Sequence, residues 1–436
     1  MKSLIAILTI FTLAPAVLRA EARDFLITES GAVGDGKTLN TAAIQRAIDK
    51  AAASEGGGRV VAPAGVFRSG SIFLKEGVAL WLDKDAVLLG STDIADYPKR
   101  DTRIEGHVES WPMALVNAQN MKHVRIGGPG KIDGNGMPFW TEFWRRRRKD
   151  PKVTNLAVER PRLIFIDTCA DVRVSDVVLR NSGFWHLHLY RCRDVVIDGL
   201  DISSTEATST GATPRLRAPS TDGIDIDSSQ NVTVRRCRFA VDDDCIALKG
   251  SKGPLADRDA SSPPVENVLV EKCVFVAGAG VVTFGSEATV VRGVIVRDCD
   301  VNGRMSVVRL KLRPDTPQTY ENILYENIRL GANGGAVISA RPWLQFFDLQ
   351  GQKPPTSVVR NLTVRNVSGA FGSFGTLGAN AGAGELAGET AGKYTIDGVV
   401  FENLDLRLGQ PRLSAGPMVR NLQMRNVKIN GEEYKK

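Results

Sequence analysis

Three consecutive aspartates occupy positions 242–244, in the stretch VDDDCIALKG, and another aspartate, Asp222, lies 22 residues before Asp244. Carboxylates that share a site raise one another's pKa, so one of them can hold a proton while a neighbour stays charged. Hydrolysis of a glycosidic bond needs this division, because one group acts as acid and another as base. A lone aspartate in a turn more often accepts hydrogen bonds from the backbone. The chemistry therefore depends on whether the chain brings Asp222, Asp243 and Asp244 together.

Basic residues alternate further along the chain, in VRLKLRPD. If this segment is a strand, Arg309, Lys311 and Arg313 lie on the same face of it. Both kinds of side chain bind carboxylates, and arginine can do so through two parallel hydrogen bonds. We therefore predict a groove for an anionic polymer beside the acids. Asp225 and Asp227 alternate with isoleucines, and we interpret them as structural, with an orienting role at the site as the alternative for Asp225.

A sequence repeat has to position these residues. A small or polar residue, then alternating β-branched residues and a polar pair, recurs nine times, for example in NVTVRRCRF from Asn231 and NVLVEKCVF from Asn267. Successive copies begin 23 to 39 residues apart, and 23 residues are too few for a strand, a crossover helix and a second strand. We predict an all-β protein, a parallel β-helix whose coils stack about 4.8 Å apart.

The repeat runs without interruption, so we predict one catalytic domain over residues 23–436. Residues 41–53, TAAIQRAIDKAAA, place small and apolar residues on one helical face, and we expect this helix to cap the N-terminal end. Three of the six cysteines, at 237, 273 and 299, share one position of the repeat, which favours buried free thiols over disulfides. The Gly/Ala-rich stretch 369–392 is interpreted as an inserted loop.

The sequence also predicts where the protein acts and what it does not bind. Residues 1–22 have the pattern of a secretory signal peptide, so we expect a secreted or periplasmic protein with no membrane span after processing. The formal net charge is +7, and its densest basic run, Arg145–Lys149 (RRRRK), is interpreted as a solvated loop, not a nucleic-acid site. The four histidines lack zinc spacing, and the chain has no phosphate loop or dinucleotide fingerprint, so we expect neither a metal nor a cofactor.

Together these stretches resemble the polygalacturonases of glycoside hydrolase family 28, from about Ala32 to the end of the chain. The resemblance rests on GAVGDGKTLNTAAIQRAID, GKIDGNG, RPRLIFIDTC, NSGFWHLHLYRC, STDGIDIDSS, DDCIALKG and RLK. It implies a right-handed, single-stranded parallel β-helix. It also implies an inverting hydrolase that cleaves α-linked galacturonic acid in a pectic polysaccharide or oligogalacturonide. We expect a monomer.

The resemblance assigns roles to individual residues. Asp243 corresponds to the general acid, and Asp222 and Asp244 to the bases that activate water. In an inverting enzyme the acid and base carboxyls stand about 6.5–9.5 Å apart. The remaining positions correspond to substrate-binding residues, and they are Arg309, Lys311, Trp185, His188 and Lys249. A packed core corner is the alternative for Trp185 and His188.

Two features of the chain depart from the family pattern. Gly278-Ala279-Gly280 stands where the family has Gly-His-Gly, and Ser220-Thr221-Asp222 stands where it has Asn-Thr-Asp. The alanine makes another pectin linkage, such as that of rhamnogalacturonan, or action at a chain end more plausible. Inserted segments 203–220 and 251–264 are expected to close one end of the groove, which favours exo action.

Two other classes of function stay open from the sequence. A pectate lyase on the same architecture would use Asp222, Asp243 and Asp244 as calcium ligands and a basic residue to abstract a proton. A non-catalytic carbohydrate-binding β-helix would have no reason to keep the acids in register with Arg309 and Lys311.

Overall fold

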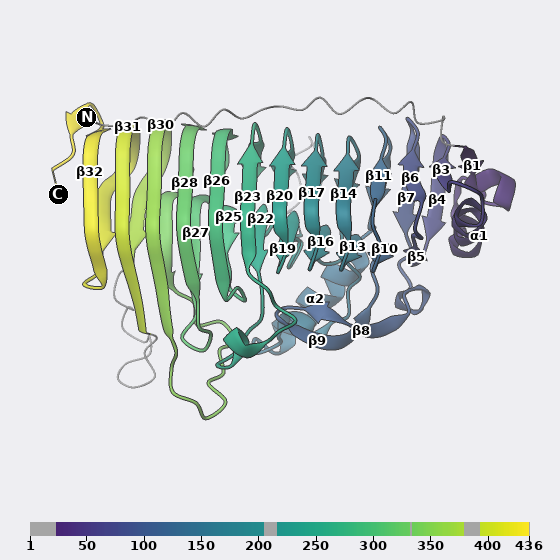
Figure 1. Cartoon of the computed structure of the whole chain (residues 1–436), viewed down its shortest axis with the longest axis horizontal. Coiled ribbons are helices and arrows are strands. Elements are labelled where there is room, and N and C mark those ends of the chain that lie inside the picture. The colour runs from purple at the N-terminus through teal and green to yellow at the C-terminus, as the bar shows by residue number, and fades with distance from the viewer. Residues whose placement is uncertain (1–22, 205–215, 332–333, 379–392, 436) are drawn as a thin grey trace, which may run out of the picture.

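A stack of short strands runs along the whole length of the molecule (Figure 1). The computed structural model describes residues 23–204, 216–331, 334–378 and 393–435, so the predicted signal peptide lies outside the described residues. Thirty-one of the described strands belong to one continuous system in which nearly every pairing is parallel. The predicted parallel β-helix is confirmed.

The parallel pairings divide the coils into three faces. The face that carries the site contains β5 (Ile72–Phe73), β10 (Val116–Gln119), β13 (Ile164–Asp167), β16 (Leu187–Tyr190), β19 (Ile224–Asp227), β22 (Ile246–Lys249), β25 (Gly280–Phe284), β27 (Ser306–Leu312) and β29 (Ala336–Pro342). The second face contains β1 (Asp24–Leu26), β3 (Gly58–Ala62), β6 (Val78–Leu82), β11 (Arg125–Gly127), β14 (Ala170–Ser175), β17 (Arg193–Asp198), β20 (Gln230–Arg235), β23 (Val265–Glu271), β26 (Val290–Val301), β28 (Thr319–Leu330), β30 (Thr356–Leu377), β31 (Lys393–Ala415) and β32 (Val419–Ile429). The third contains β2 (Asp35–Leu39), β4 (Gly65–Ser69), β7 (Ala86–Gly90), β12 (Lys131–Asp133), β15 (Val178–Arg180), β18 (Asp201–Ser203), β21 (Arg238–Ala240) and β24 (Val274–Ala277).

The longest late strands continue from the second face onto the others, and β30 also pairs with β29 on the site face. Short elements complete the described structure: the antiparallel hairpin β8 (Lys99–Ile104) and β9 (His107–Pro112), the terminal β33 (Glu432–Glu433), and the 3-10 helices η1 (Ile27–Ser30), η2 (Ile94–Asp96), η3 (Asn155–Ala157) and η4 (Ala256–Arg258).

The repeat has a physical basis in its first residue. Asn231, Asn267 and Asn322 each start a copy with a φ between 55° and 58°, in the left-handed region that asparagine adopts more readily than most residues. This bend turns the chain into each new strand. The side chains also stack, because the Asn267 amide donates a hydrogen bond of 3.0 Å to Asn231 one coil away. The β-branched residues that follow point inward and form the core, where Val232, Val268 and Val294 lie in register.

The helix α1 (Thr41–Ala52) packs against β1, β3, β5 and η1 at the N-terminal end of the stack. Its buried residues Ala43, Ile44, Ala47, Ile48 and Ala51 are those of the apolar face predicted for 41–53, so the cap is confirmed. All six cysteines are buried and free, as the repeat predicted.

Two sequence interpretations were wrong. Arg145–Lys149 is the last turn of a second helix, α2 (Met137–Lys149), because Phe139, Trp140 and Phe143 bury one face of it against the solenoid. Residues 369–377 belong to β30, where glycine lets neighbouring coils approach closely: a Cβ on Gly369 would lie 2.2 Å from the carbonyl oxygen of Leu330. Residues 379–392 lie outside the described structure. Neither of the helices in the described ranges is long and apolar enough to cross a membrane.

Candidate active site

The coil register brings the three predicted acids together. Ile224 pairs with Ile246, an offset of 22 residues, and the Gly223 amide donates a hydrogen bond of 2.9 Å to the carbonyl of Asp244. Asp222, just before β19, therefore lies beside Asp243 and Asp244, just before β22. One carboxylate oxygen from each of the three lies within 4.8 Å of the others. These nearest oxygens are closer than the 6.5–9.5 Å expected for an acid and base that hold a water between them, so this spacing alone does not indicate inversion.

Asp244 is the permanently charged member of the trio. Its oxygens accept hydrogen bonds of 2.7 Å each from Arg309, Lys311 and the hydroxyl of Thr283. Burial alone would raise the pKa of Asp244, but the positive charges of Lys311 and Arg309 outweigh burial and hold that pKa well below its usual range. Arg309 reaches this position because Gly280 lacks a side chain: a Cβ there would lie 2.9 Å from the Arg309 Cδ.

Asp222 is the group that changes its proton near neutral pH. Burial raises its pKa to about 7; the Lys249 ammonium opposes this rise, and the charges of Asp243 and Asp244 add to it. The buried Asp225 carboxyl lies on the same side of β19, and burial together with the charge of Asp222 raises its pKa well above the usual value. Asp243 is the least buried of the three predicted catalytic acids. It also lines the cavity described below.

Lys249 lies at the floor of the site, buried among carboxylates. Its ammonium is 3.4 Å from Asp222, 3.5 Å from Asp225 and 3.4 Å from Glu287. It also lies 4.6 Å from the centre of the Trp185 ring, which forms part of the cavity lining. In the free protein Lys249 therefore holds the acids in place. Sequence reasoning had counted it among the residues that bind substrate.

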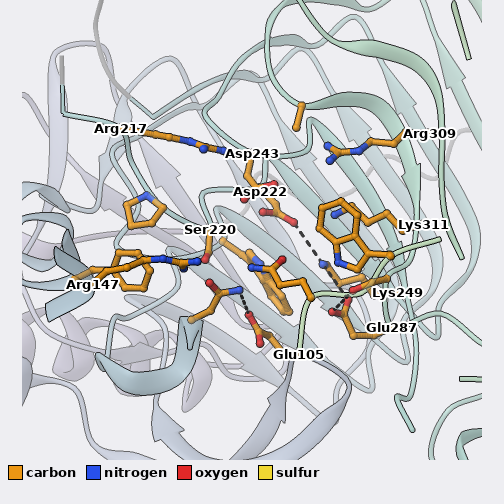
Figure 2. A pocket seen from close by; sticks show the side chains of 18 of the residues that line it. Glu105, Arg147, Arg217, Ser220, Asp222, Asp243, Lys249, Glu287, Arg309 and Lys311 are labelled. Atoms are coloured by element: carbon orange, nitrogen blue, oxygen red, sulfur yellow. Dashed lines mark hydrogen bonds and ion pairs between the residues drawn. The ribbon is translucent and has the colours of Figure 1, made fainter. Parts of the chain in front are cut away.

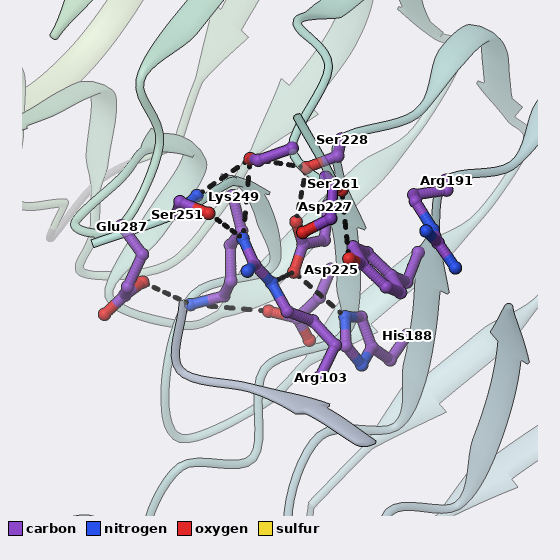
Figure 3. A network of polar contacts seen from close by, with 12 residues as sticks. Arg103, His188, Arg191, Asp225, Asp227, Ser228, Lys249, Ser251, Ser261 and Glu287 are labelled. Carbon is purple, nitrogen blue, oxygen red and sulfur yellow. Dashed lines mark hydrogen bonds and ion pairs between the residues drawn. The ribbon is translucent and has the colours of Figure 1, made fainter. Parts of the chain in front are cut away.

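His188 does not line the cavity, so its predicted contact with substrate is wrong for this structure. The ring is completely buried behind Trp185, with Nδ1 2.8 Å from the Arg162 guanidinium and Nε2 3.4 Å from Asp227. Burial lowers its pKa to about 4, so the imidazole is neutral at neutral pH. Figure 3 shows His188, Asp227 and Arg103 in one polar network, which makes His188 part of the packing that supports the site.

The acids open into a cavity of about 650 Å³ (Figure 2). Its walls come from segments far apart in the sequence: Glu105 after β8, Phe143, Trp144 and Arg147 on α2, Arg217 to Ser220 before β19, and Trp343 to Gln345 after β29. In Figure 2, Arg147 and Arg217 lie on the other side of the aspartates from Arg309 and Lys311. Cations therefore flank the acids from two sides.

The two inserted segments have different fates. Arg217, Pro219 and Ser220, from the end of 203–220, do line the cavity, whereas residues 205–215 lie outside the described structure. No residue of 251–264 is part of the cavity lining in the described chain. That segment instead holds the β8–β9 hairpin, because Ser251 and Ser262 both accept hydrogen bonds from the buried Arg103.

Sequence reasoning missed much of the wall. Glu105, Trp144, Arg147, Glu287 and Trp343 were not predicted as site residues. A signal for α2 existed, since the aromatic residues at 139, 140, 143 and 144 have helical spacing and place Arg147 one turn after Phe143. No pattern in the sequence announces Glu105 or Trp343, which follow the ends of strands.

The three aspartates have the oxygen ligands that a hard cation needs. Their surroundings fit a cation poorly, because Arg309 and Lys311 already bind both oxygens of Asp244 and the Lys249 ammonium lies 3.4 Å from Asp222. The arrangement suits proton transfer with an anionic substrate better than calcium binding.

Known proteins share this sequence and fold. The chain is 30% identical over 286 residues to a probable polygalacturonase of Vitis vinifera, a match that covers 62% of the chain but 53% of the relative. It is 26% identical over 353 residues to an exopolygalacturonase of Zea mays, covering 79% and 76%. The chain thus spans about half of the first relative and three quarters of the second.

A solved structure supports the fold. The exopolygalacturonase of Thermotoga maritima superimposes with a TM-score of 0.69 at 24% identity, over 95% of this chain and 94% of that one, and confirms the right-handed parallel β-helix. The family model for rhamnogalacturonase A/epimerase, pectate lyase-like proteins matches residues 25–84, a segment without the three aspartates. The model described as glycosyl hydrolases family 28 matches residues 59–400, most of the chain and all of the acids, so the protein belongs to that family.

Proposed function

We propose that this protein hydrolyses the bonds between galacturonic acid residues in pectin and releases product from a chain end. The observation that carries this proposal is the trio of Asp222, Asp243 and Asp244 in one cavity, with protonatable and permanently charged members side by side. Cations on both sides of the acids suit a substrate with a carboxylate on each sugar.

The environments of the acids suggest how they divide the work. Asp243, the most accessible of the three, protonates the leaving oxygen. Asp222 activates water, because a base works best when its pKa lies near the operating pH. Asp244 remains ionised and orients the water from the other side. Because water attacks the face opposite the leaving group, the anomeric configuration inverts.

Arg309 and Lys311 can serve the substrate without releasing Asp244. Arg309 binds Asp244 through Nη1 alone and keeps other N–H donors, and its side chain remains 16% exposed toward the cavity. Trp343 lies beside both cations, with its ring centre 4.7 Å from the Lys311 ammonium and 5.5 Å from the Arg309 guanidinium carbon. Its ring provides a flat apolar surface on which a sugar can stack.

Action at a chain end follows from the walls. The helix α2 and the turn between β8 and β9 close the cavity on the side toward the N-terminal coils, and Arg147 and Arg217 face inward there. Neither arginine makes an ion pair within the described residues; Arg217 donates only to the carbonyl of Asp242. They are placed to bind the carboxylate of the terminal sugar. Export through the predicted signal peptide would bring the enzyme, as a monomer, to its polymer outside the cytoplasm.

One set of incubations tests the proposal. Polygalacturonate, digalacturonate and rhamnogalacturonan are compared, and product length and anomeric configuration are followed by chromatography and NMR. We expect short products from galacturonan with inverted configuration. Asp243→Asn should lower kcat at least about 100-fold. Asp242→Asn is the matched control, because Asp242 accepts a backbone hydrogen bond from Ala218 and does not line the cavity.

Other results would point elsewhere. An unsaturated product that absorbs ultraviolet light and disappears with chelator would indicate a lyase. Cleavage of rhamnogalacturonan alone would reassign the linkage, and a random mixture of long products would contradict action at a chain end. Unchanged turnover in Asp243→Asn would favour a carbohydrate-binding protein.

A further inference from the structure

A second hollow, of about 620 Å³, begins where the catalytic cavity ends. Ala279 and Arg309 line both, so the two spaces meet at these residues. The second hollow, which we call the trough, extends over β27, β29 and the last residues of β30 and β31, toward the C-terminal coils. The small side chain of Ala279 leaves the junction open.

The strand register gives the trough a floor of small polar side chains. Arg309 pairs with Ser339, Ser339 with Thr376, and Thr376 with Ser414, so four successive coils continue one row. Coils repeat at about 4.8 Å, so the row offers a hydroxyl at each step. Larger residues at these outward positions would fill the trough.

The charge of the trough is one-sided. Its described lining includes Arg304, Arg341 and Arg412 besides Arg309, and none of the lining residues is acidic. Arg304, Arg341 and Arg412 have no ion-pair partner among the residues that the structure describes. Arg341 even stacks in register with Lys311 of the preceding coil, and like charges placed directly opposite each other on a sheet destabilise it.

Arginines on the second face are treated differently. Arg297, Arg329 and Arg365 each pair with the acid directly in register one coil away, at 2.7, 2.6 and 2.6 Å. The chain therefore neutralises its stacked arginines where they have no other partner. The unpaired arginines of the trough leave room for an anion from outside.

From these contacts we infer that the trough binds the rest of an acidic polysaccharide chain whose end lies in the catalytic cavity. Sugar carboxylates bind the guanidiniums, and sugar hydroxyls bind the row of serine and threonine side chains. The inference rests on the proposed function for the identity of the polymer. Because α2 and the β8–β9 hairpin close the opposite side of the cavity, the chain leaves over β29 and β30, and affinity increases with chain length.

The test compares substrates of different length in the double variant Arg341→Ala/Arg412→Ala. We expect kcat/KM on polygalacturonate to fall roughly three- to tenfold, the sum of two exposed charge contacts, while hydrolysis of digalacturonate is unchanged. Added salt should reduce the preference of the wild type for long chains, since these contacts are exposed and screened. Arg407→Ala is the matched control, because Arg407 is exposed on the same strand, β31, outside the trough.

The possible failures are distinguishable. Equal losses on long and short substrates, or no loss on either, would overturn the trough while leaving the proposed hydrolysis intact. If the wild type cleaves no galacturonan, the proposed function fails, and calorimetric titration with a long oligogalacturonate and with a neutral glucan still judges the trough. Binding of the acidic chain that the double variant weakens supports it; equal binding by both proteins contradicts it. Melting temperatures confirm that the variants fold.

Discussion

Arg309 and Asp244 are 65 residues apart in the sequence and joined by a hydrogen bond of 2.7 Å in the folded protein. This contact shows that a cation predicted for substrate also sets the charge of a catalytic acid. Lys311 binds the other oxygen of the same carboxylate. Replacing either cation should therefore change the proton chemistry of the site as well as substrate affinity.

Arg309→Met is the first test of this double role. Loss of one positive charge should raise the pKa of Asp244, so the acid side of the profile of kcat/KM against pH should move to higher pH. A residue that only bound substrate would raise KM and leave the pH profile in place. Arg304→Met, which removes an arginine from the trough but not from Asp244, is the matched control.

The pH dependence of the wild type tests the role of Asp222. Its pKa of about 7 is set mainly by burial, and a base must be ionised to accept a proton. If Asp222 activates water, kcat/KM rises through about pH 7, and this step disappears in Asp222→Asn along with most of the activity. A fall of kcat/KM through the same range, removed by the same substitution, would make Asp222 the acid and reverse the proposed assignment.

The same group should affect stability in the opposite direction. The pKa of Asp222 is raised from 3.8 to about 7 in the folded state. Between these values the folded protein binds more protons than the unfolded chain, so stability declines as the pH rises from about 4 to 7. We expect Asp222→Asn to gain melting temperature relative to the wild type as the pH increases over this range. A difference that does not depend on pH would contradict the raised pKa.

The fold and the acid trio could be predicted because both depend on the repeat. A 22-residue step from Asp222 to Asp244 is the register offset of two coils, so the sequence spacing translates directly into a contact. Arg309 and Lys311 followed from strand alternation. The partners that these cations choose could not be predicted, since a groove-lining cation and one bound to Asp244 have the same sequence pattern.

The walls could not be predicted because they come from insertions, whose placement depends on packing. RRRRK suggested a solvated segment, yet Phe139, Trp140 and Phe143 anchor its helix and bring Arg147 to the cavity. His188 alternates like a groove residue, but the β8–β9 hairpin and Arg162 cover it. Insertions of this kind follow no period, so the repeat carries no information about them.

Arg147 tests whether the wall recognises a chain end. Arg147→Met removes an inward-facing cation without an ion-pair partner in the described residues, so we expect KM for oligogalacturonates to rise roughly tenfold, as for a lost charged hydrogen bond. Arg148→Met, next to it on α2 but outside the cavity, should have no effect. An oligogalacturonate whose terminal carboxyl is reduced to an alcohol should bind the wild type and Arg147→Met equally. A difference that persists with the reduced substrate would show that Arg147 acts through packing.

The contact between Arg103 and Asp227 tests how the walls are fixed to the solenoid. Arg103, from the inserted β8, donates a hydrogen bond of 3.0 Å to Asp227 at the end of β19, and both side chains are 1% exposed. Arg103→Met leaves a buried carboxylate without its partner, so the free energy of unfolding should fall by about 3–5 kcal/mol in denaturant titrations. Arg103→Met/Asp227→Asn should lose less than the sum of the single changes, because the pair acts as a unit.

Arg100→Met is the matched control on the same strand, since Arg100 is exposed and stacks only on Phe73, a contact of about 1 kcal/mol or less. If Arg103→Met costs no more than Arg100→Met, the buried pair does not hold the hairpin. If it costs more, the hairpin is fixed from inside. Glu105 follows directly after Arg103 and Ile104, so loosening this anchor should also raise KM by disturbing the cavity wall.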